Sequence, residues 1–239
     1  MSDIQTTDTA SVPVIIDNSN EVAAIANYLA QEDPQTTIGK LLKFSKGEYL
    51  KGLDGEVVPE DSLFAVACDR TLTGFVRWRD GKPAEHKLVR IASGAPLYRR
   101  EDLGFDDKDE WPKDAKGEPR DPWQPSMYVP MMDSEGEICT FTTSSGSGIK
   151  SLQRLLRRYA GHVKRHPNDY PLVKLKVDYY QHSDKSIGKV FYPEFEPAGY
   201  VNKTEFVEAL EVIGAAVIAP TASAALPAPK DEFNDHIPY

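Results

Sequence analysis

The feature that most restricts the fold is a succession of short segments, from Thr37 to about Tyr200, in which apolar and polar residues alternate between turn residues. Alternation with a period of two is typical of half-buried β-strands. We predict strands at 41–50, 63–67, 74–79, 86–91, 127–132, 138–142, 172–180 and 189–192. A helical period replaces this pattern from about Gly148 to His166. Many short strands with one clear helix favour a barrel or a sandwich with an inserted helix, so we predict a β-rich α+β fold.

Composition divides the chain into four regions. These are an acidic N-terminal arm (1–36), a β-rich core that ends in a helix (37–218), an Ala/Pro linker (219–230) and an acidic tip (231–239). The arm has no Lys or Arg, and the spacing of Val22, Ile25 and Leu29 predicts a short helix in it. The linker has too few large apolar side chains to pack, so we expect it to be disordered.

Within the core, residues 101–125 interrupt the strand pattern with many acidic residues and prolines. We predict a long surface loop there, pinned by Trp111 and Trp123. A last core helix is expected to begin near Asn202 and to continue to about Ile218.

Length and charge narrow the class of protein. The 239 residues suffice for one substantial domain, and the net charge is −9 at pH 7. No apolar run approaches the roughly 20 residues of a membrane helix, and no Lys or Arg precedes Lys40, so a basic signal-peptide start is missing. We expect a cytoplasmic protein. Cys68 and Cys139 lie in apolar surroundings, which favours core positions over a disulfide or a metal site.

The helix at 148–166 carries the densest positive charge in the chain. Its cations are accompanied by no acidic residue and lie opposite an apolar face. They are Lys150, Arg154, Arg157, Arg158, Lys164 and Arg165. A solvated helix surface and a phosphate-binding surface are both consistent with this pattern, and the absence of any compensating acid favours phosphate binding.

Three predicted strands place cations beside aromatic rings, which are the two groups that single-stranded nucleic acids need for backbone contact and base stacking. The residues are Lys43 and Phe44 on the first strand, Phe75, Arg77 and Arg79 on the third, and Lys174, Lys176 and Tyr180 on the seventh. Each strand alone is more typical of an ordinary solvated face with a packed aromatic residue. Together they suggest an oligonucleotide-binding (OB)-like barrel, or a related antiparallel sheet, with an exposed nucleic-acid-binding face.

The chain ends in a cluster of acids followed by an Ile-Pro-aromatic tripeptide. The residues expected to bind a partner are Asp231, Glu232, Phe233, Asp235, Ile237, Pro238 and Tyr239. This segment resembles the acidic C-terminal tip of bacterial single-stranded DNA-binding proteins (SSB), which typically closes with Asp residues and Ile-Pro-Phe; Tyr239 stands here in the place of that Phe. The resemblance implies that the tip recruits replication, recombination and repair proteins and competes with DNA for the basic groove. The alternative is a solvated chain end that happens to finish in an aromatic residue.

No catalytic constellation emerges. The acids of 101–125 lie among Pro, Gly and Lys rather than on the rigid elements that a Mg²⁺ site needs. His162 and His166 have helical spacing but lack the Glu of a zinc-protease motif, and Ile149 breaks the Gly-Lys-Ser order of a phosphate-binding loop. We therefore expect a non-enzymatic protein without metal or cofactor.

These features predict a bacterial or phage protein that coats single-stranded DNA non-specifically through a basic and aromatic surface, and that recruits host or phage replication and recombination proteins through residues 231–239. The alternative is a phage-encoded interaction protein that uses an SSB-like tail to occupy a host partner without binding DNA. An oligonucleotide titration distinguishes the two, because only the first predicts salt-dependent binding.

Overall fold

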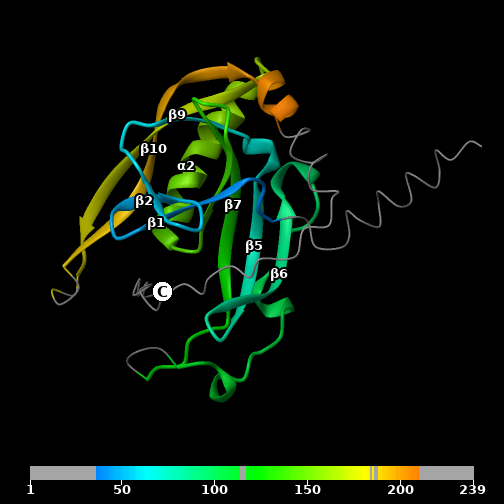
Figure 1. The fold of residues 1–239 in the computed structure, drawn as a ribbon. Helices are drawn as coiled ribbons and strands as arrows, with labels where there is room; N and C mark the ends of the chain where they lie inside the picture. Colours follow the sequence, from blue (N-terminus) through cyan, green and yellow to red (C-terminus); the bar gives the residue numbers. More distant parts are fainter. Residues whose placement is uncertain (1–35, 114–116, 184, 186–187, 210–239) are drawn as a thin grey trace, which may run out of the picture. The chain divides into compact units, whose positions relative to one another are not determined.

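The computed structural model describes residues 36–113, 117–183, 185 and 188–209 (Figure 1). The helix predicted in the arm, the linker at 219–230 and the tip at 231–239 lie outside the described residues. The chain divides into two units, Met1–Pro34 and Gln35–Tyr239, and all the described residues belong to the second.

Ten strands of this unit form one sheet. The strands are β1 (Lys40–Ser45), β2 (Glu48–Lys51), β3 (Glu56–Val58), β4 (Leu63–Val66), β5 (Leu72–Arg79), β6 (Lys82–Arg90), β7 (Trp123–Asp133), β8 (Ile138–Thr143), β9 (Asp169–Gln181) and β10 (Lys189–Asn202). Their order is β10-β9-β4-β7-β8-β1-β2-β3, with β5 paired to β7 and β6 to β5. All pairings are antiparallel except that of β1 with β8. The predicted β-rich class is confirmed.

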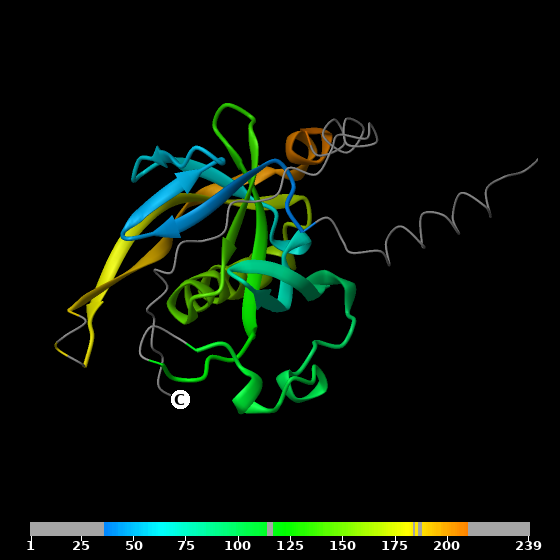
Figure 2. The ribbon, with the colours of Figure 1, turned by 60° about the horizontal axis from the view of Figure 1, so that its bottom comes forward.

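The sheet curls so that its two ends meet on one side. The Tyr49 hydroxyl, on β2, donates to the backbone oxygens of Lys176 on β9, at 3.0 Å, and Glu194 on β10, at 3.2 Å. Beside it, a Cβ at Gly47 would lie 3.3 Å from the ring of Phe191. The β1–β2 hairpin therefore runs along the β9–β10 hairpin, as Figure 2 shows, although these strands lie far apart in the sheet order.

One helix, α2 (Gly146–Val163), lies against β10 and β9 (Figure 1). Ser145 caps its first turn, because the Ser145 hydroxyl accepts the backbone N–H of Gly148 at 3.1 Å. Leu152, Leu155 and Tyr159 are buried in the main core, as the sequence pattern predicts. The opposite face of α2, which holds most of its cations, is left exposed.

The strand predictions hold with three corrections. The single strand expected at 41–50 is the β1–β2 hairpin, because Lys46 and Gly47 both have positive φ and turn the chain. β3 was not predicted, since three residues carry too little pattern to detect. The last strand continues to Asn202 rather than ending at Tyr192. Its prolines are tolerated there because β10 ends the sheet order and needs no second partner for their missing N–H groups.

Residues 101–113 and 117–122 form mainly a loop, with two short 3₁₀ turns at Arg100–Asp102 and Lys108–Glu110, whereas residues 123–125, predicted to be loop, already belong to β7. The loop is cross-linked by its own side chains: Arg100 lies 2.6 Å from Asp121 and 3.1 Å from Asp106. The Trp111 indole donates to the backbone oxygen of Phe105 at 2.6 Å. Trp123 is buried at the start of β7.

Both cysteines are buried and unpaired, as predicted. Burial raises the pKa of the Cys139 thiol to about 12. At the other end of the described chain, residues 203–209 are helical, and the Asn202 side chain accepts the backbone N–H of Thr204 at 2.9 Å, so this helix begins where it was predicted. Among the described residues, no helix is long and apolar enough to cross a membrane.

Candidate nucleic-acid interface

Three of the exposed aromatic residues of the described chain, Tyr179, Tyr180 and Phe191, gather on the distal half of the β9–β10 hairpin. Tyr179 and Phe191 are direct cross-strand partners, with ring centroids 6.0 Å apart. Tyr179 is 49% and Phe191 44% exposed. The ammonium group of Lys189 lies 4.1 Å from the centroid of the Tyr179 ring. One face of the hairpin therefore presents two partly exposed rings, with a cation over one of them.

The other face of the same hairpin also carries rings. Tyr180 lies 6.3 Å from Tyr192 and 6.5 Å from His182, measured between ring centroids. The Tyr192 hydroxyl donates to Asp178 at 2.6 Å, which fixes the ring and raises the pKa of this phenol. The same hydrogen bond holds the pKa of Asp178 below its usual range. The hairpin is thus a ribbon with aromatic side chains on both faces.

The exposure of these rings follows from the length of the strands. Along β9, Val173 and Leu175 are fully buried and face Phe195 and the rest of the core. Two residues further on, Val177 is half-buried, and Tyr179 on the same face is exposed. The hairpin continues past the elements that cover its inner face, so aromatic side chains that alternation directs inward meet solvent instead.

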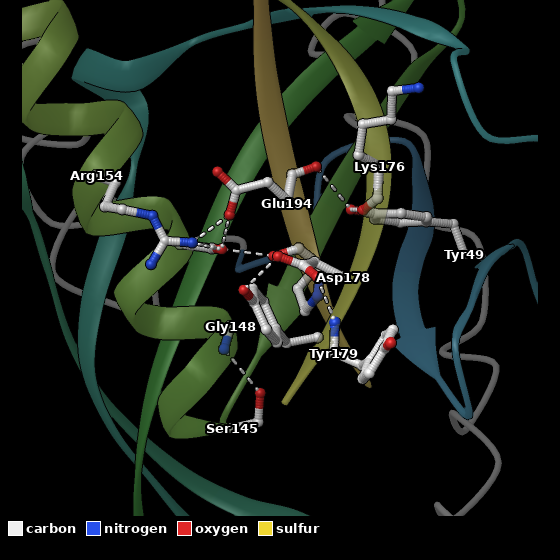
Figure 3. A network of polar contacts seen from close by, with 11 residues as sticks. Tyr49, Ser145, Gly148, Arg154, Lys176, Asp178, Tyr179 and Glu194 are labelled. Carbon is white, nitrogen blue, oxygen red and sulfur yellow. Dashed lines mark hydrogen bonds and ion pairs between the residues drawn. The ribbon is translucent and has the colours of Figure 1, made fainter. Parts of the chain in front are cut away.

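One predicted cation of α2, Arg154, contacts the β9–β10 hairpin and is not directed fully to solvent. Arg154 forms an ion pair with Glu194 of β10 (Figure 3). Ser151 donates to the backbone oxygen of Pro193 at 2.5 Å. The Glu194 carboxylate also lies 2.9 Å from the Ser151 hydroxyl. Arg154 therefore fastens α2 to the edge strand.

The remaining cations of α2 are exposed and form no ion pair with any described residue. They are Lys150, Arg157 and Arg158 on α2, together with Lys164 and Arg165, which directly follow its last residue, Val163. α2 runs alongside β10, with Ser151 bonded to Pro193 and His162 stacked on Tyr200, so the N-terminal end of α2, with Lys150, lies toward the exposed rings. This juxtaposition supplies both groups that a single strand requires, cations and open ring faces.

The predicted cations of β9 are largely compensated. Lys176 lies 2.7 Å and Lys174 4.0 Å from the same carboxylate, that of Asp61. The Lys176 ammonium group, as hydrogen-bond donor and nearby charge, lowers the pKa of Asp61. Tyr180 lies further along the same strand, among the rings of the hairpin. Of the three β9 candidates, Tyr180 is thus the one that the structure places in the aromatic cluster.

The β5 candidates do not form one exposed surface. Arg77 pairs with Glu85 at 3.0 Å and has only 15% of its side chain exposed. Its guanidinium lies 4.5 Å from the Phe105 ring centroid, so it packs the long loop onto the sheet. Phe75 is half-buried, and Arg79 is exposed at the strand end.

On β1, Lys43 is exposed, whereas Phe44 turns inward and packs edge-on against Tyr49 with the ring centroids 5.0 Å apart. Phe44 therefore packs against the core and does not lie on the exposed face, where it was predicted. The sequence interpretation did not include Tyr179 among the surface candidates, and it also omitted Lys189, Phe191 and Tyr192. Only the strand register, which places Phe191 opposite Tyr179, reveals that these residues cluster.

No protein-family model matches the chain, and neither the curated proteins nor the solved structures searched give a match. The case for a function therefore depends on the geometry.

Proposed function

We propose that this chain is a non-enzymatic single-stranded DNA-binding protein whose β9–β10 hairpin stacks on bases while the outer face of α2 follows the phosphate backbone. The observation that carries the proposal is the pair of exposed, facing rings, Tyr179 and Phe191, with Lys189 beside them. Every base has a π-face, so such rings bind without sequence preference.

The exposed rings favour single strands over duplex. Bases in a duplex are stacked on one another, and an aromatic side chain reaches a base face only after unstacking, which costs a few kcal/mol per step. A single strand offers free faces, and each base stacked on an aromatic residue contributes about 1–3 kcal/mol. A micromolar affinity corresponds to a binding free energy of about 8 kcal/mol. Two stacked bases, one each on Tyr179 and Phe191, would therefore supply a substantial part of it.

The curled sheet supports a more specific proposal, that the fold is OB-like. A partly closed, mainly antiparallel sheet with a long hairpin leaving it is compatible with barrels that bind oligonucleotides on their exposed strands and loops. This argument is an analogy at the level of fold and has less weight than the rings.

The second half of the proposal concerns residues 231–239, which lie outside the described residues. Their acidic cluster and terminal Ile-Pro-Tyr support recruitment of replication or recombination proteins by the free carboxyl end. We expect removal of Tyr239 to abolish capture of host replication proteins in a pull-down while DNA binding is kept. Equal capture by the shortened chain would rule out this anchoring role.

The DNA-binding test is a fluorescence anisotropy titration of the full chain with a labelled dT oligonucleotide and a labelled duplex, each at two salt concentrations. We expect binding to the dT oligonucleotide that weakens with salt, and weaker binding to the duplex. The double variant Tyr179→Ala/Phe191→Ala should lose at least tenfold in affinity for dT, because two stacking contacts disappear.

The matched control is Tyr98→Ala, which removes an aromatic side chain of similar exposure, 42%, from the loop after β6. This variant should bind dT as the parent does. If the parent does not bind dT even at low salt, the proposal fails and the chain is instead an interaction protein with an SSB-like tail. Equal losses in the double variant and the control would also refute the assignment of the hairpin.

A further inference from the structure

The end of α2 and the start of β9 bring two histidines and an aspartate together. His162 Nε2 lies 2.8 Å from Asp169 Oδ2, and His166 Nδ1 lies 4.0 Å from the same oxygen. The three candidate ligand atoms lie within 4.8 Å of one another. We infer that His162, His166 and Asp169 form a binding site for a divalent transition metal, with Zn²⁺ the best match to the ligand set.

Local backbone geometry produces this cluster. The backbone N–H of His166 donates to the oxygen of His162 at 3.2 Å, so one further helical turn follows α2 and aligns the two side chains. The N–H of Asp169 then donates to the oxygen of His166 at 3.3 Å, which turns the chain back so that β9 begins beside the helix end. This turn places the Asp169 carboxylate beside the two histidines, and the spacing of the histidines alone does not predict it.

The spacing of the ligand atoms suits a tetrahedral ion. Zinc binds imidazole nitrogen and carboxylate oxygen at about 2.0–2.2 Å, which places neighbouring ligand atoms about 3.3–3.6 Å apart. The observed separations of 2.8 Å and 4.0 Å from Asp169 lie on either side of that value. Two imidazoles and a carboxylate leave the fourth position to water or to an incoming ligand, as in open zinc sites.

The surroundings hold one ligand firmly and leave another adjustable. The Tyr200 ring of β10 stacks flat on His162, with centroids 3.4 Å apart and planes 7° from parallel. The ring of His166 lies nearly parallel to the ring of His162, with the ring centroids 4.5 Å apart and 16° between the ring planes. Parallel rings do not direct both nitrogens at one ion, so His166 must turn. Its side chain is 58% exposed, which leaves room for that rotation.

A bound ion would join α2 to β9 at the end opposite the Arg154 contact, and would replace the hydrogen bond between His162 and Asp169 with stronger coordination. Because the site uses none of the proposed base-stacking residues, the inference does not rest on the proposed function. Among the described residues this is the one cluster of three or more metal-ligating side chains.

The test is isothermal titration of the tag-free full chain with ZnCl₂, with Co²⁺ absorption spectra as a second readout of coordination. We expect one ion per chain, and at least a tenfold loss of affinity in His166→Ala and in Asp169→Asn. His166→Ala is the cleaner variant, since its side chain is largely exposed and the fold should be kept, as circular dichroism checks.

The matched control is His182→Ala, which removes a histidine of the β9–β10 hairpin outside the cluster and should bind Zn²⁺ as the parent does. The inference is overturned if the parent binds no Zn²⁺ or if His166→Ala and Asp169→Asn bind it with parental affinity. A loss in His182→Ala equal to that in His166→Ala would also overturn it, because binding would then not be specific to this site.

Discussion

Neighbouring arginines on α2 should respond to mutation in different ways, because the structure gives them different contacts. Arg157 and Arg158 are exposed and pair with no described acid, whereas Arg154 pairs with Glu194 of β10. We expect Arg157→Ala/Arg158→Ala to weaken binding to single-stranded DNA without destabilising the fold. We expect Arg154→Ala to destabilise the fold and to change the salt dependence of binding little.

The magnitudes follow from the contacts. If each exposed arginine neutralises one phosphate, the slope of log K against log salt concentration falls by about 0.7 per arginine on a single strand, or about 1.4 for the double variant. The pair of Arg154 and Glu194 is partly solvated, with 40% and 27% of the side chains exposed, so its loss should cost about 1 kcal/mol after allowance for solvent screening. For a domain of this size that corresponds to a decrease in Tm of about 2–4 °C.

The assay combines anisotropy titrations of a dT oligonucleotide at four salt concentrations with calorimetric Tm measurements on the same protein samples. The reasoning is refuted if Arg154→Ala reduces the salt slope as much as the double variant while its Tm stays at the parental value. It is also refuted if the double variant keeps the parental slope, because the outer face of α2 would then make no phosphate contacts.

Two further predictions concern stability. Gly74 has φ 151°, and a Cβ there would lie 2.1 Å from the backbone oxygen of Lys87, so Gly74→Ala should lower the free energy of unfolding by about 3 kcal/mol or more. Gly161 lies in a helix with open space around it, so Gly161→Ala should raise the free energy of unfolding by about 0.5–1 kcal/mol. Urea unfolding measures both changes. Equal effects of the two substitutions would contradict this reasoning. Lys51 donates to Glu137 at 2.8 Å and Asp133 at 3.2 Å, so Lys51→Met should cost about 2 kcal/mol at pH 7.

The Lys51 effect has a defined pH window. Glu137, and to a lesser extent Asp133, raises the pKa of Lys51. The contribution of Lys51 to the free energy of unfolding is therefore full below its pKa in the unfolded chain, about 10.4, and disappears as pH rises through its pKa in the folded chain. Lys40 and Lys51 lower the pKa of Glu137, so its contribution is full above about 4.3 and disappears as pH falls through its lower folded pKa. The difference in unfolding free energy between parent and variant should therefore shrink below about pH 4, and a constant difference from pH 3 to 8 would contradict the assignment.

The strands were predictable where side chains alternate clearly, and less so where backbone conformation decides. The β4 residues Leu63–Val66 were found from pattern alone. The turn at Lys46 and Gly47, by contrast, depends on positive φ angles within a segment that reads as one strand. The extension of β10 past Pro193 depends on its place at the end of the sheet order, a tertiary property that one strand does not encode.

The candidate site was less predictable than the fold, because sequence shows which residues are charged but not which charges are paired. Lys174 and Lys176 share Asp61, Arg77 pairs with Glu85, and Arg154 with Glu194. Only Arg77 and Glu85 lie near each other in the sequence, on adjacent strands of a hairpin. The other acids come from distant parts of the chain.

This pairing explains how a chain with net charge −9 can still offer the phosphate-binding surface that we propose. The acids of β10 and of the turn before β4 compensate cations on the sheet and on the inner flank of α2, and the outer flank of α2 keeps its charge. Since exposed charges more than about 8 Å apart are largely screened at physiological salt, the proposed binding would depend on this local flank rather than on the total charge. In the function that we propose, the exposed rings of the β9–β10 hairpin select single strands, because they gain stacking energy only from bases that are already free.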